Sequence, residues 1–342
     1  AGVFLISRAP EGQPLSPPAD NLTALSFSDS ALLEGTTYIY EVRSHVGLGA
    51  VSTGSNLAVT TTVPAAPTNF QAAAVDDQTI QLSWQNGSAK KVSYLVEHRL
   101  LLPPGQSYTP LTTTSGTLFV HDKLAEGSGH QYRVTAVLAG RENSLPKELN
   151  SVAVETSATT KTWKTAYSVV LTSDDDVARK GFCMVQKINS ENLQFSGTKI
   201  RLTLRGASAA TFVVDKITVS RPAVAGTPGN PTPEPFDSTG GSIVEVLSKG
   251  ISGVILAPGS TVVLDPTFFS LVKTAGVLVA FDVAAGLGNG TARRKNSVFP
   301  GGTPAPAFYC KAGVAEASNA DRAGPYEVFS NTVYVVEKVE VL

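Results

Sequence analysis

Three consecutive aspartates, Asp174, Asp175 and Asp176, are the residues of this sequence whose types best suit a metal cation. Ca²⁺ prefers carboxylate oxygens, so the segment TSDDDVARKG (172–181) admits a calcium site. The spacing is not that of an EF-hand loop, in which the ligands are spread over about 12 residues. A run of charged side chains is more commonly a solvated turn. We therefore expect a solvated turn here and assign no metal ligand.

The second polar candidate is the basic loop GNGTARRKNS (288–297), which contains Arg293, Arg294 and Lys295 in a row. Such a loop could meet a sulfated or phosphorylated glycan, and aromatic rings near loops could stack on its sugar rings. The aromatic candidates are Phe236, Phe299, Tyr309 and Tyr326. The residues chosen as candidate ligand contacts are Phe299, Arg293, Arg294 and Tyr326. The opposing interpretation is that the arginines serve solubility and the rings pack in a core.

General acid–base chemistry would fall first to the histidines, which are His45, His98, His121 and His130. None belongs to a catalytic motif, because the sequence has no G-x-S-x-G elbow, no H-E-x-x-H zinc motif and no phosphate loop. His98 and His121 fall on expected strands, where they are interpreted as ordinary structural residues. We therefore expect a protein that is not an enzyme, with no catalytic residue, no cofactor and no metal site.

The two cysteines, Cys183 and Cys310, leave two alternatives open. A disulfide between them would close a loop of about 127 residues, worth about 4–5 kcal/mol if it acts by restricting the unfolded chain. Alternatively, both are buried thiols, since a free cysteine packs as a small hydrophobic residue. No histidine lies at ligand spacing from either cysteine, so neither contributes to a recognisable metal motif.

The composition limits the class of protein and its partners. The 342 residues suffice for two or three domains. Only 16% are charged, below the roughly 25% usual in soluble domains, and Thr, Ser, Ala, Gly and Val are abundant instead, which favours strands and turns. A net charge of −1 offers no basic field, and no apolar run reaches the roughly 18 residues of a membrane span. We expect no nucleic-acid partner and no membrane insertion.

A short pattern occurs twice, first in LLEGTTYIYEV (32–42) and again ninety-two positions later in KLAEGSGHQYRV (123–134). Around the second copy, apolar and polar residues alternate, as in Ile80, Leu82 and Trp84, and turn clusters such as PPGQS separate the alternating segments. The strands expected from this alternation are 65–75, 79–86, 92–100, 117–124, 130–139 and 150–157. Short alternating strands at this spacing predict an antiparallel β-sandwich.

The second copy resembles a fibronectin type III domain over residues 64–158. The residues that carry the resemblance are Pro67, Trp84, Tyr94, Leu124, Gly127, Tyr132, Val134 and Ala136. The resemblance implies a core built around Trp84 and a tyrosine corner at Tyr132, in which a buried ring sends its hydroxyl back to upstream backbone. Gly127 would permit the tight turn before that strand.

The first copy, residues 1–63, matches only the later part of that pattern. VFLISR (3–8) resembles YLVEHR (94–99) of the third strand, and TALSFSDS (23–30) takes the place of the fourth. YIYEVRS (38–44) and NLAVTTT (56–62) match the last two strands, and nothing before Val3 corresponds to the first two. We expect a partial domain whose missing strands come from roughly 30 upstream residues or from another chain. The alternative is a degenerate half-domain packed on its neighbour.

After TSATTKTWKT the repeat stops, and residues 159–342 form a third domain. The strands expected there are 166–173, 198–206, 211–221, 242–248, 259–267, 276–284, 306–313 and 331–341. That number of strands predicts a jelly-roll-like sandwich, so that the whole chain is expected to be all-β. DPTFFSLVK (265–273) is expected to hold a short helical turn, and the proline-rich loop 221–241 to be irregular.

The strands of the third domain, from KIRLTLRG to GVLVAFDVA, resemble β-sandwich modules in bacteriophage tail proteins and beside SGNH-type hydrolases in secreted bacterial proteins. The resemblance implies a non-catalytic virion protein, the C-terminal part of a tail tip, tail fibre or surface fibre, with sandwich spacers displaying a terminal domain. Its partners would be other virion subunits, copies of itself in an oligomer, or a host-surface glycan. The alternatives are a spacer and glycan-binding module of a secreted polysaccharide-active enzyme, or a bacterial surface adhesin.

Overall fold

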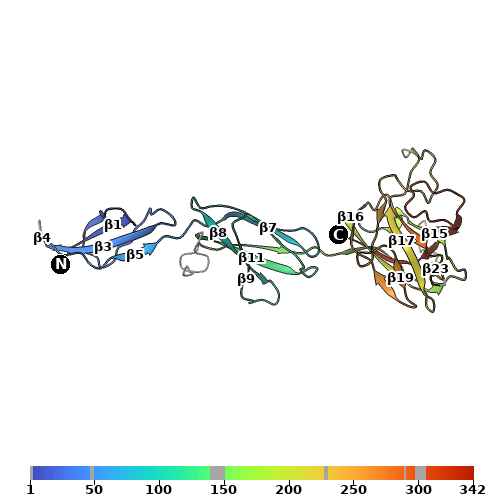
Figure 1. The fold of residues 1–342 in the computed structure, drawn as a ribbon, viewed down its shortest axis with the longest axis horizontal. Coiled ribbons are helices and arrows are strands. Elements are labelled where there is room, and N and C mark those ends of the chain that lie inside the picture. The colour runs from blue at the N-terminus through green and yellow to red at the C-terminus, as the bar shows by residue number, and fades with distance from the viewer. Residues whose placement is uncertain (1–2, 47–49, 139–150, 227–229, 289, 297–305) are drawn as a thin grey trace. The chain divides into compact units, whose positions relative to one another are not determined.

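The computed structural model describes residues 3–46, 50–138, 151–226, 230–288, 290–296 and 306–342. Their regular elements are antiparallel strands and one 3₁₀ turn, Ser190–Asn192, so the expected all-β class is confirmed. No helix in these ranges has the length and apolarity needed to cross a membrane. The chain divides into two compact units, residues 1–161 and 162–342 (Figure 1).

The first part of unit one is a single five-stranded sheet in the order β2-β1-β3-β4, with β5 also paired to β3. Its strands are β1 (Val3–Pro10), β2 (Ser16–Leu22), β3 (Thr37–Val46), β4 (Ala50–Val51) and β5 (Ala58–Thr61). The strand expected at 23–30 is absent, and the preceding segment SPPADNL forms β2 instead. Pro17 and Pro18 suit this place, because β2 is an edge strand and proline has no N–H for a further ladder.

The register of this sheet corrects the expected alignment of its first strand. Ile6 lies opposite Val42 in the first copy, whereas Val96 lies opposite Val134 in the second. Ile6 therefore occupies the place of Val96, which the sequence comparison had given to Leu5. A shift of one residue moves every side chain of a strand to the other face, so the core-facing residues are Phe4 and Ile6.

That face of the first sheet is an open apolar hollow of about 540 Å³. Its lining includes Phe4, Ile6, Tyr40 and Val42, together with Leu25 from the segment after β2. Val42 is 38% exposed and Leu25 is 93% exposed, so no second layer covers them in the described residues. The described residues of the first copy thus form a single antiparallel sheet, which corresponds to one layer of the complete sandwich.

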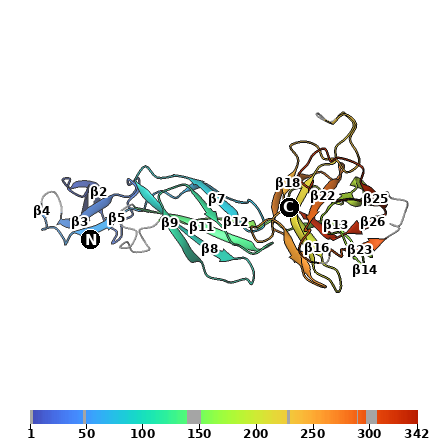
Figure 2. The ribbon, with the colours of Figure 1, turned by 45° about the vertical axis from the view of Figure 1, so that its right-hand side comes forward.

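The second part of unit one is a complete sandwich of two antiparallel sheets, in the orders β10-β7-β6 and β12-β11-β8-β9 (Figure 2). Its strands are β6 (Thr68–Ala74), β7 (Ile80–Gln85), β8 (Val92–Leu100), β9 (Thr109–Thr114), β10 (Leu118–His121), β11 (Gly129–Leu138) and β12 (Val154–Thr159). Ile80 and Leu82 are fully buried, and the Trp84 ring packs edge-on against Tyr94 at 5.4 Å, as the resemblance implied. Strand β9 was not expected from the sequence.

The expected tyrosine corner lies two residues earlier than the sequence comparison placed it. Tyr132 is fully buried, but its hydroxyl lies 3.0 Å from Nδ1 of His121 and not against upstream backbone. In the first copy, the hydroxyl of Tyr38 accepts a hydrogen bond from the backbone N–H of Leu33 at 2.9 Å. The residue ninety-two positions after Tyr38 is His130, so a histidine occupies the corner of the second copy.

Unit two is a sandwich of a five-stranded and a seven-stranded sheet, with a separate three-stranded sheet β14-β23-β26. The five-stranded sheet contains β13 (Lys164–Ser168), β27 (Val336–Val341), β16 (Gly197–Arg205), β20 (Thr261–Val263) and β21 (Thr267–Leu271). The seven-stranded sheet contains β18 (Val244–Glu245), β17 (Phe212–Ser220), β22 (Val277–Val283), β15 (Phe182–Ile188), β24 (Ala307–Ala312), β25 (Glu327–Ser330) and β19 (Val254–Leu256). One hydrophobic cluster joins the two sheets through residues such as Leu202, Phe281 and Val339.

This unit is larger than a jelly roll of about eight strands. The helical turn expected at 265–273 is instead strand β21, in which Phe269 and Leu271 are buried and Phe268 is exposed. Buried and exposed side chains alternate along this segment, as in a strand, and its proline, Pro266, lies just before the first strand residue. The last strand, β27, pairs with both β13 and β16, so the end of the chain is central to its sheet.

Two irregular segments, the proline-rich loop and the segment around Arg322, cover the outer face of the seven-stranded sheet. The hydrophobic cluster on this face contains Cys183, Val185, Phe236, Leu278, Ala280, Tyr309, Ala317 and Tyr326. Arg322 is only 1% exposed, and its guanidinium donates to the backbone carbonyls of Phe236, Ala317 and Glu316. The described residues of the loop, 221–226 and 230–241, are mostly irregular, as expected, and Arg322 links the loop to the neighbouring segment.

Candidate functional site

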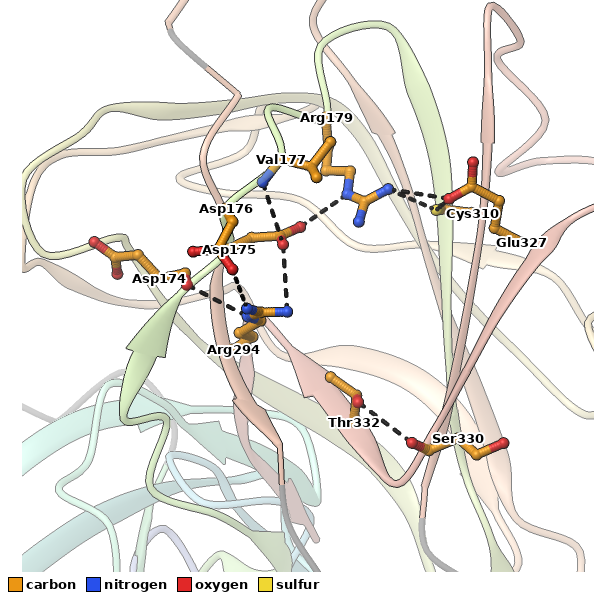
Figure 3. A network of polar contacts seen from close by, with 10 residues as sticks. All are labelled: Asp174, Asp175, Asp176, Val177, Arg179, Arg294, Cys310, Glu327, Ser330 and Thr332. Atoms are coloured by element: carbon orange, nitrogen blue, oxygen red, sulfur yellow. Dashed lines mark hydrogen bonds and ion pairs between the residues drawn. The ribbon is translucent and has the colours of Figure 1, made fainter.

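The acidic run and the basic loop, which are far apart in the sequence, meet in one small sheet of unit two. Strand β14 (Ser173–Asp174) pairs with β23 (Arg293–Asn296), and Asp174 lies directly opposite Arg293. Strand β26 (Thr332–Tyr334) pairs with the other edge of β23. Opposite charges are therefore brought together by backbone pairing, and Figure 3 shows the polar network that results.

Both candidate arginines in this sheet are bound by aspartates. Arg293 Nη1 lies 2.7 Å from Oδ1 of Asp174, and Arg294 Nη2 lies 3.0 Å from Oδ2 of Asp176. Arg294 also donates from Nε to the backbone carbonyl of Asp174 (Figure 3). The side chains of Arg293 and Arg294 are 18% and 17% exposed. Their contact with a glycan stays a prediction, and any such ligand would have to compete with these carboxylates.

Asp175 belongs to a buried ion pair and not to a solvated turn. Its Oδ2 accepts a hydrogen bond from Arg179 Nε at 2.8 Å, and the two side chains are 2% and 3% exposed. Arg179 Nη1 also lies 3.3 Å from Sγ of Cys310 and 3.4 Å from Oε2 of Glu327 (Figure 3). The solvated-turn interpretation fits only Asp176, whose side chain is 90% exposed. The alternative of a calcium site would need carboxylates that arginines already occupy.

Acidification is expected to destabilise unit two in part through Asp174. Burial opposes its charge, but hydrogen bonds from Ser208 and Arg293 outweigh burial and lower its pKa from the ordinary value of 3.8. A carboxylate with a lowered folded-state pKa stabilises the fold above the unfolded-state pKa, and this contribution is lost as the pH falls through the folded-state pKa. Urea unfolding at pH values from about 6 to about 3 should show a steeper loss of stability in the wild type than in D174N. Equal slopes would contradict this role.

The aromatic candidates lie in the cluster on the outer face of the seven-stranded sheet. Tyr326 is 7% exposed, its ring stacks on Phe236 at 4.3 Å, and its hydroxyl donates to Glu316 at 2.7 Å. Tyr309 is also buried and lies 5.5 Å from the Phe236 ring. Phe299 lies outside the described residues. The packing that was the alternative interpretation is thus present for three rings, and ligand contact by Tyr326 or Phe299 stays a prediction.

The two cysteines are free and buried on neighbouring strands, which decides between the two alternatives. Cys310 in β24 lies opposite Met184 in β15, so Cys183 is offset from it by one residue. Because side chains alternate between faces, Cys310 joins the core between the sheets and Cys183 joins the cluster on the outer face. The sheet itself therefore separates the two sulfur atoms.

Both thiols are expected to resist modification in the folded protein. Burial raises the pKa of Cys183 to about 11 and that of Cys310 to about 12, so neither supplies appreciable thiolate near neutral pH. A disulfide-exchange reagent should label neither thiol in native protein and both in urea without a reductant. Fast labelling of the native protein would contradict the burial of the thiols. Absence of labelling in urea would show that the two cysteines form a disulfide.

Three of the four histidines, of which His98 and His121 were expected to be ordinary structural residues, lie together at one end of the complete sandwich. Nε2 of His98 lies 2.9 Å from Nδ1 of His130. His121 comes from the facing sheet, and one nitrogen of each ring lies within 4.8 Å of the other two. Burial lowers the pKa of all three, that of His130 to about 4. The three imidazoles are therefore neutral near pH 7.

A shallow hollow of about 290 Å³ in unit two presents an aromatic ring to solvent. Phe268, which is 78% exposed, lies on its rim with Arg221 and Ser242, and the ammonium of Lys199 lies 5.4 Å from the Phe268 ring centre. Sequence reasoning missed Phe268 because the segment was expected to be helical. An exposed ring beside polar and cationic groups is a surface on which a sugar ring can stack.

The chain is similar to several solved structures. No protein-family model and no curated protein matches this chain. A two-domain fibronectin type III segment of chicken tenascin is similar at 16% identity, covering 46% of this chain and 84% of that one, with a TM-score of 0.33. FN3tt is similar at 21% identity, 30% and 98% coverage and a TM-score of 0.24. The chicken CNTN1 FN1–FN3 domains give 13% identity, 47% and 56% coverage and a TM-score of 0.27.

These TM-scores are low, and the fold is therefore assigned from the order and pairing of the strands in this chain. In residues 64–158, two facing antiparallel sheets with the orders β10-β7-β6 and β12-β11-β8-β9 enclose Trp84, Tyr94 and Tyr132. The first copy repeats β8, β11 and β12 as β1, β3 and β5. The chain therefore carries one complete and one partial fibronectin type III-like sandwich, followed by a larger sandwich.

Proposed function

We propose that this chain is a non-catalytic structural or adhesion protein that assembles with copies of itself or with other virion subunits. In this proposal it is part of a bacteriophage tail tip, tail fibre or surface fibre. The fibronectin type III-like domains act as spacers, and the large sandwich of unit two is the domain that they display. Localisation to a virion follows from the same proposal, with secretion or a cell surface as the alternative.

The observation that carries the proposal is the uncovered apolar face of the first sheet. In the complete sandwich, Val96 and Val134 are fully buried beneath the sheet that contains β7. Their counterparts Ile6 and Val42 line an open hollow, and Val42 is 38% exposed. A face built for a second layer of strands is an interaction surface, because such patches are costly to leave in water.

The chemistry of the hollow specifies the kind of partner that fits it. Most of its lining is apolar, and its charged group Asp29 is already held by Arg8 at 2.7 Å. The partner should therefore present a strand with apolar residues at alternate positions, as β7 does with Ile80, Leu82 and Trp84. A strand from another subunit meets this requirement without any charge pairing.

Sedimentation velocity over a range of protein concentrations tests the assembly. The wild-type chain should form a defined oligomer, and V42E, which adds a charge to the hollow, should shift it toward monomer. The matched control is V51E, because Val51 is 53% exposed on β4 and does not line the hollow. A wild type that stays monomeric, or equal effects of V42E and V51E, would count against assembly through this face.

Phe268 favours a second candidate function, which is glycan binding by unit two as a module of a secreted polysaccharide-active enzyme or an adhesin. A glycan array should then show binding that F268A abolishes. The matched control is F195A, because Phe195 is also exposed and also has a lysine, Lys164, 5.5 Å from its ring centre. Absence of binding by the wild type, or equal loss in both variants, would remove this candidate.

A further inference from the structure

We propose that His98, His121 and His130 form a binding site for a transition-metal ion of the Zn²⁺ class in the complete sandwich. The three imidazoles come from three strands and from both sheets. His98 in β8 and His130 in β11 belong to one sheet, and His121 in β10 belongs to the facing sheet. A metal ion held by all three would therefore link the two layers of the sandwich.

The positions of the three rings follow from the register of the strands. His98 lies opposite the buried Tyr132, and His121 lies opposite the buried Ile80, so both side chains face the interior of the sandwich. The ring centres of His98 and His121 are 4.8 Å apart, and those of His98 and His130 are 5.0 Å apart. No regular feature of a sandwich requires three imidazoles to meet at one end of its core.

The nitrogen atoms are close to the separations that a shared metal ion needs. One nitrogen of each ring lies within 4.8 Å of the others, and Nε2 of His98 is 2.9 Å from Nδ1 of His130. Two nitrogens bound to one tetrahedral Zn²⁺ at about 2.0–2.1 Å lie about 3.3 Å apart. Small rotations of His98 and His121 would bring all three to that separation.

Neighbouring groups hold the second ring nitrogen of His130 and of His121, as outer-shell partners do in metal sites. The hydroxyl of Ser128 donates to the carbonyl of Ala125, so it accepts from His130 Nε2–H at 2.6 Å. That leaves the Nδ1 lone pair of His130 facing His98. His121 Nδ1 lies 3.0 Å from the hydroxyl of the fully buried Tyr132, which leaves its Nε2 for a metal ion.

The three side chains also suit a transition-metal ion, which binds imidazole in its neutral form. Imidazole ligands suit Zn²⁺, Cu²⁺ and Ni²⁺ rather than Ca²⁺ or Mg²⁺.

The first copy of the repeat has no histidine at the same corner. The register places Arg8 where the second copy has His98, since Arg8 pairs with Tyr40 as His98 pairs with Tyr132. Asp29 and Tyr38 lie ninety-two positions before His121 and His130. Arg8 and Asp29 form a 2.7 Å ion pair, and the Arg8 guanidinium lies 5.5 Å from the Tyr38 ring centre.

The comparison shows that the fold does not need histidines at this corner. The first copy satisfies the three positions with an internal ion pair, and the hydroxyl of Tyr40 donates to Asp29 at 2.9 Å. The second copy replaces all three residues with histidine, and Tyr132 meets His121 where Tyr40 meets Asp29. The presence of one metal-ligating residue type at all three equivalent positions supports a common ligand. Three nitrogens leave a fourth position for water or another group, as in zinc sites with one open position.

The test uses the full 342-residue chain without a polyhistidine tag, freed of metal with a chelator. Calorimetric titration with ZnCl₂ should show that one ion binds per chain. In a separate thermal unfolding experiment, zinc should raise the unfolding midpoint, and excess chelator should return it to the metal-free value. Titration with CoCl₂ provides an independent readout, because a low-coordinate Co²⁺ site with nitrogen ligands has visible absorption bands.

Three variants show which residues hold the ion. H121A removes one ligand. Loss of an outer-shell partner weakens metal affinity by about 10–100-fold, so loss of a direct ligand should weaken zinc binding by more than that. The variant H98R/H121D/H130Y carries the residues of the first copy and should fold without binding zinc. H45A is the matched control, because His45 belongs to the first sheet and its loss should leave zinc binding unchanged.

The outcomes separate a real site from adventitious binding. Stoichiometric binding that H45A retains and H121A loses supports the proposal, and circular dichroism of H121A shows whether its fold is intact. If the triple variant fails to fold, H121A and the cobalt spectrum still decide. Absence of zinc binding in the wild type, or equal weak binding in the wild type, H45A and H121A, would overturn the proposal.

Discussion

Replacing Arg322 with methionine is expected to lower the free energy of unfolding of unit two by at least about 3 kcal/mol. The side chain is 1% exposed, and its guanidinium donates to three backbone carbonyls and, at 3.0 Å, to the hydroxyl of Ser238. Methionine fills much of the same volume but donates nothing. The carbonyls of Phe236 and Glu316 lose the hydrogen bond from Arg322, whereas the carbonyl of Ala317 and the hydroxyl of Ser238 keep their bonds to Thr218 and Ser220. Each unsatisfied buried group costs about 1–3 kcal/mol.

Urea unfolding followed by thiol labelling measures this loss in unit two alone, because both cysteines of the chain lie in that unit. The matched control is R221M, since Arg221 is exposed and its replacement should change stability by no more than about 0.5 kcal/mol. A small effect of R322M, similar to that of R221M, would show that Arg322 does not hold the two covering segments.

Removing Asp175 should have the second large effect, because it leaves the buried Arg179 without its main anionic partner. Breaking a buried ion pair from one side costs about 3–5 kcal/mol, since the remaining charge stays desolvated. D175A should therefore destabilise unit two by about that amount, measured by the same thiol-labelling assay. Asp176 supplies the control in the neighbouring position, because its side chain is 90% exposed and D176A should be nearly neutral.

A double-mutant cycle separates the ion pair from other consequences of the substitution. D175A/R179M removes both charges, so it should be less destabilised than the sum of the two single variants. Additive effects would mean that Asp175 and Arg179 contribute independently. In that case the 2.8 Å contact between them would not be the source of the stability.

The strands of the complete sandwich could be predicted wherever apolar residues alternate. Ile80, Leu82 and Trp84 were expected to face inward, and all three are buried. Strand β9, with the sequence TPLTTT, escaped prediction because threonines and one proline give no apolar alternation. The segment 23–30 was assigned a strand by homology with the second copy, but β2 forms from the preceding residues.

The contacts of the candidate sites depend on register and long-range pairing, which periodicity does not contain. Asp174 meets Arg293 because β14 pairs with β23, and nothing local to either segment indicates this. The histidines are a partial exception. The repeat interval relates His121 and His130 to Asp29 and Tyr38, so the sequence alone could have shown that the second copy has histidine at both equivalent positions. That His98 lies beside His121 and His130 could not be predicted in this way, because it depends on the register of β8 and β11.

We expect partner strands to cover the open face of the first sheet in an assembly. Oxidative footprinting by mass spectrometry, comparing the oligomer with the monomer fraction, tests it most directly. We predict that Phe4, Phe27 and Tyr40, which line the hollow, are labelled less in the oligomer, while the exposed Phe268 of unit two is labelled equally in both. Equal labelling of Phe4, Phe27 and Tyr40 in the two fractions would contradict the claim.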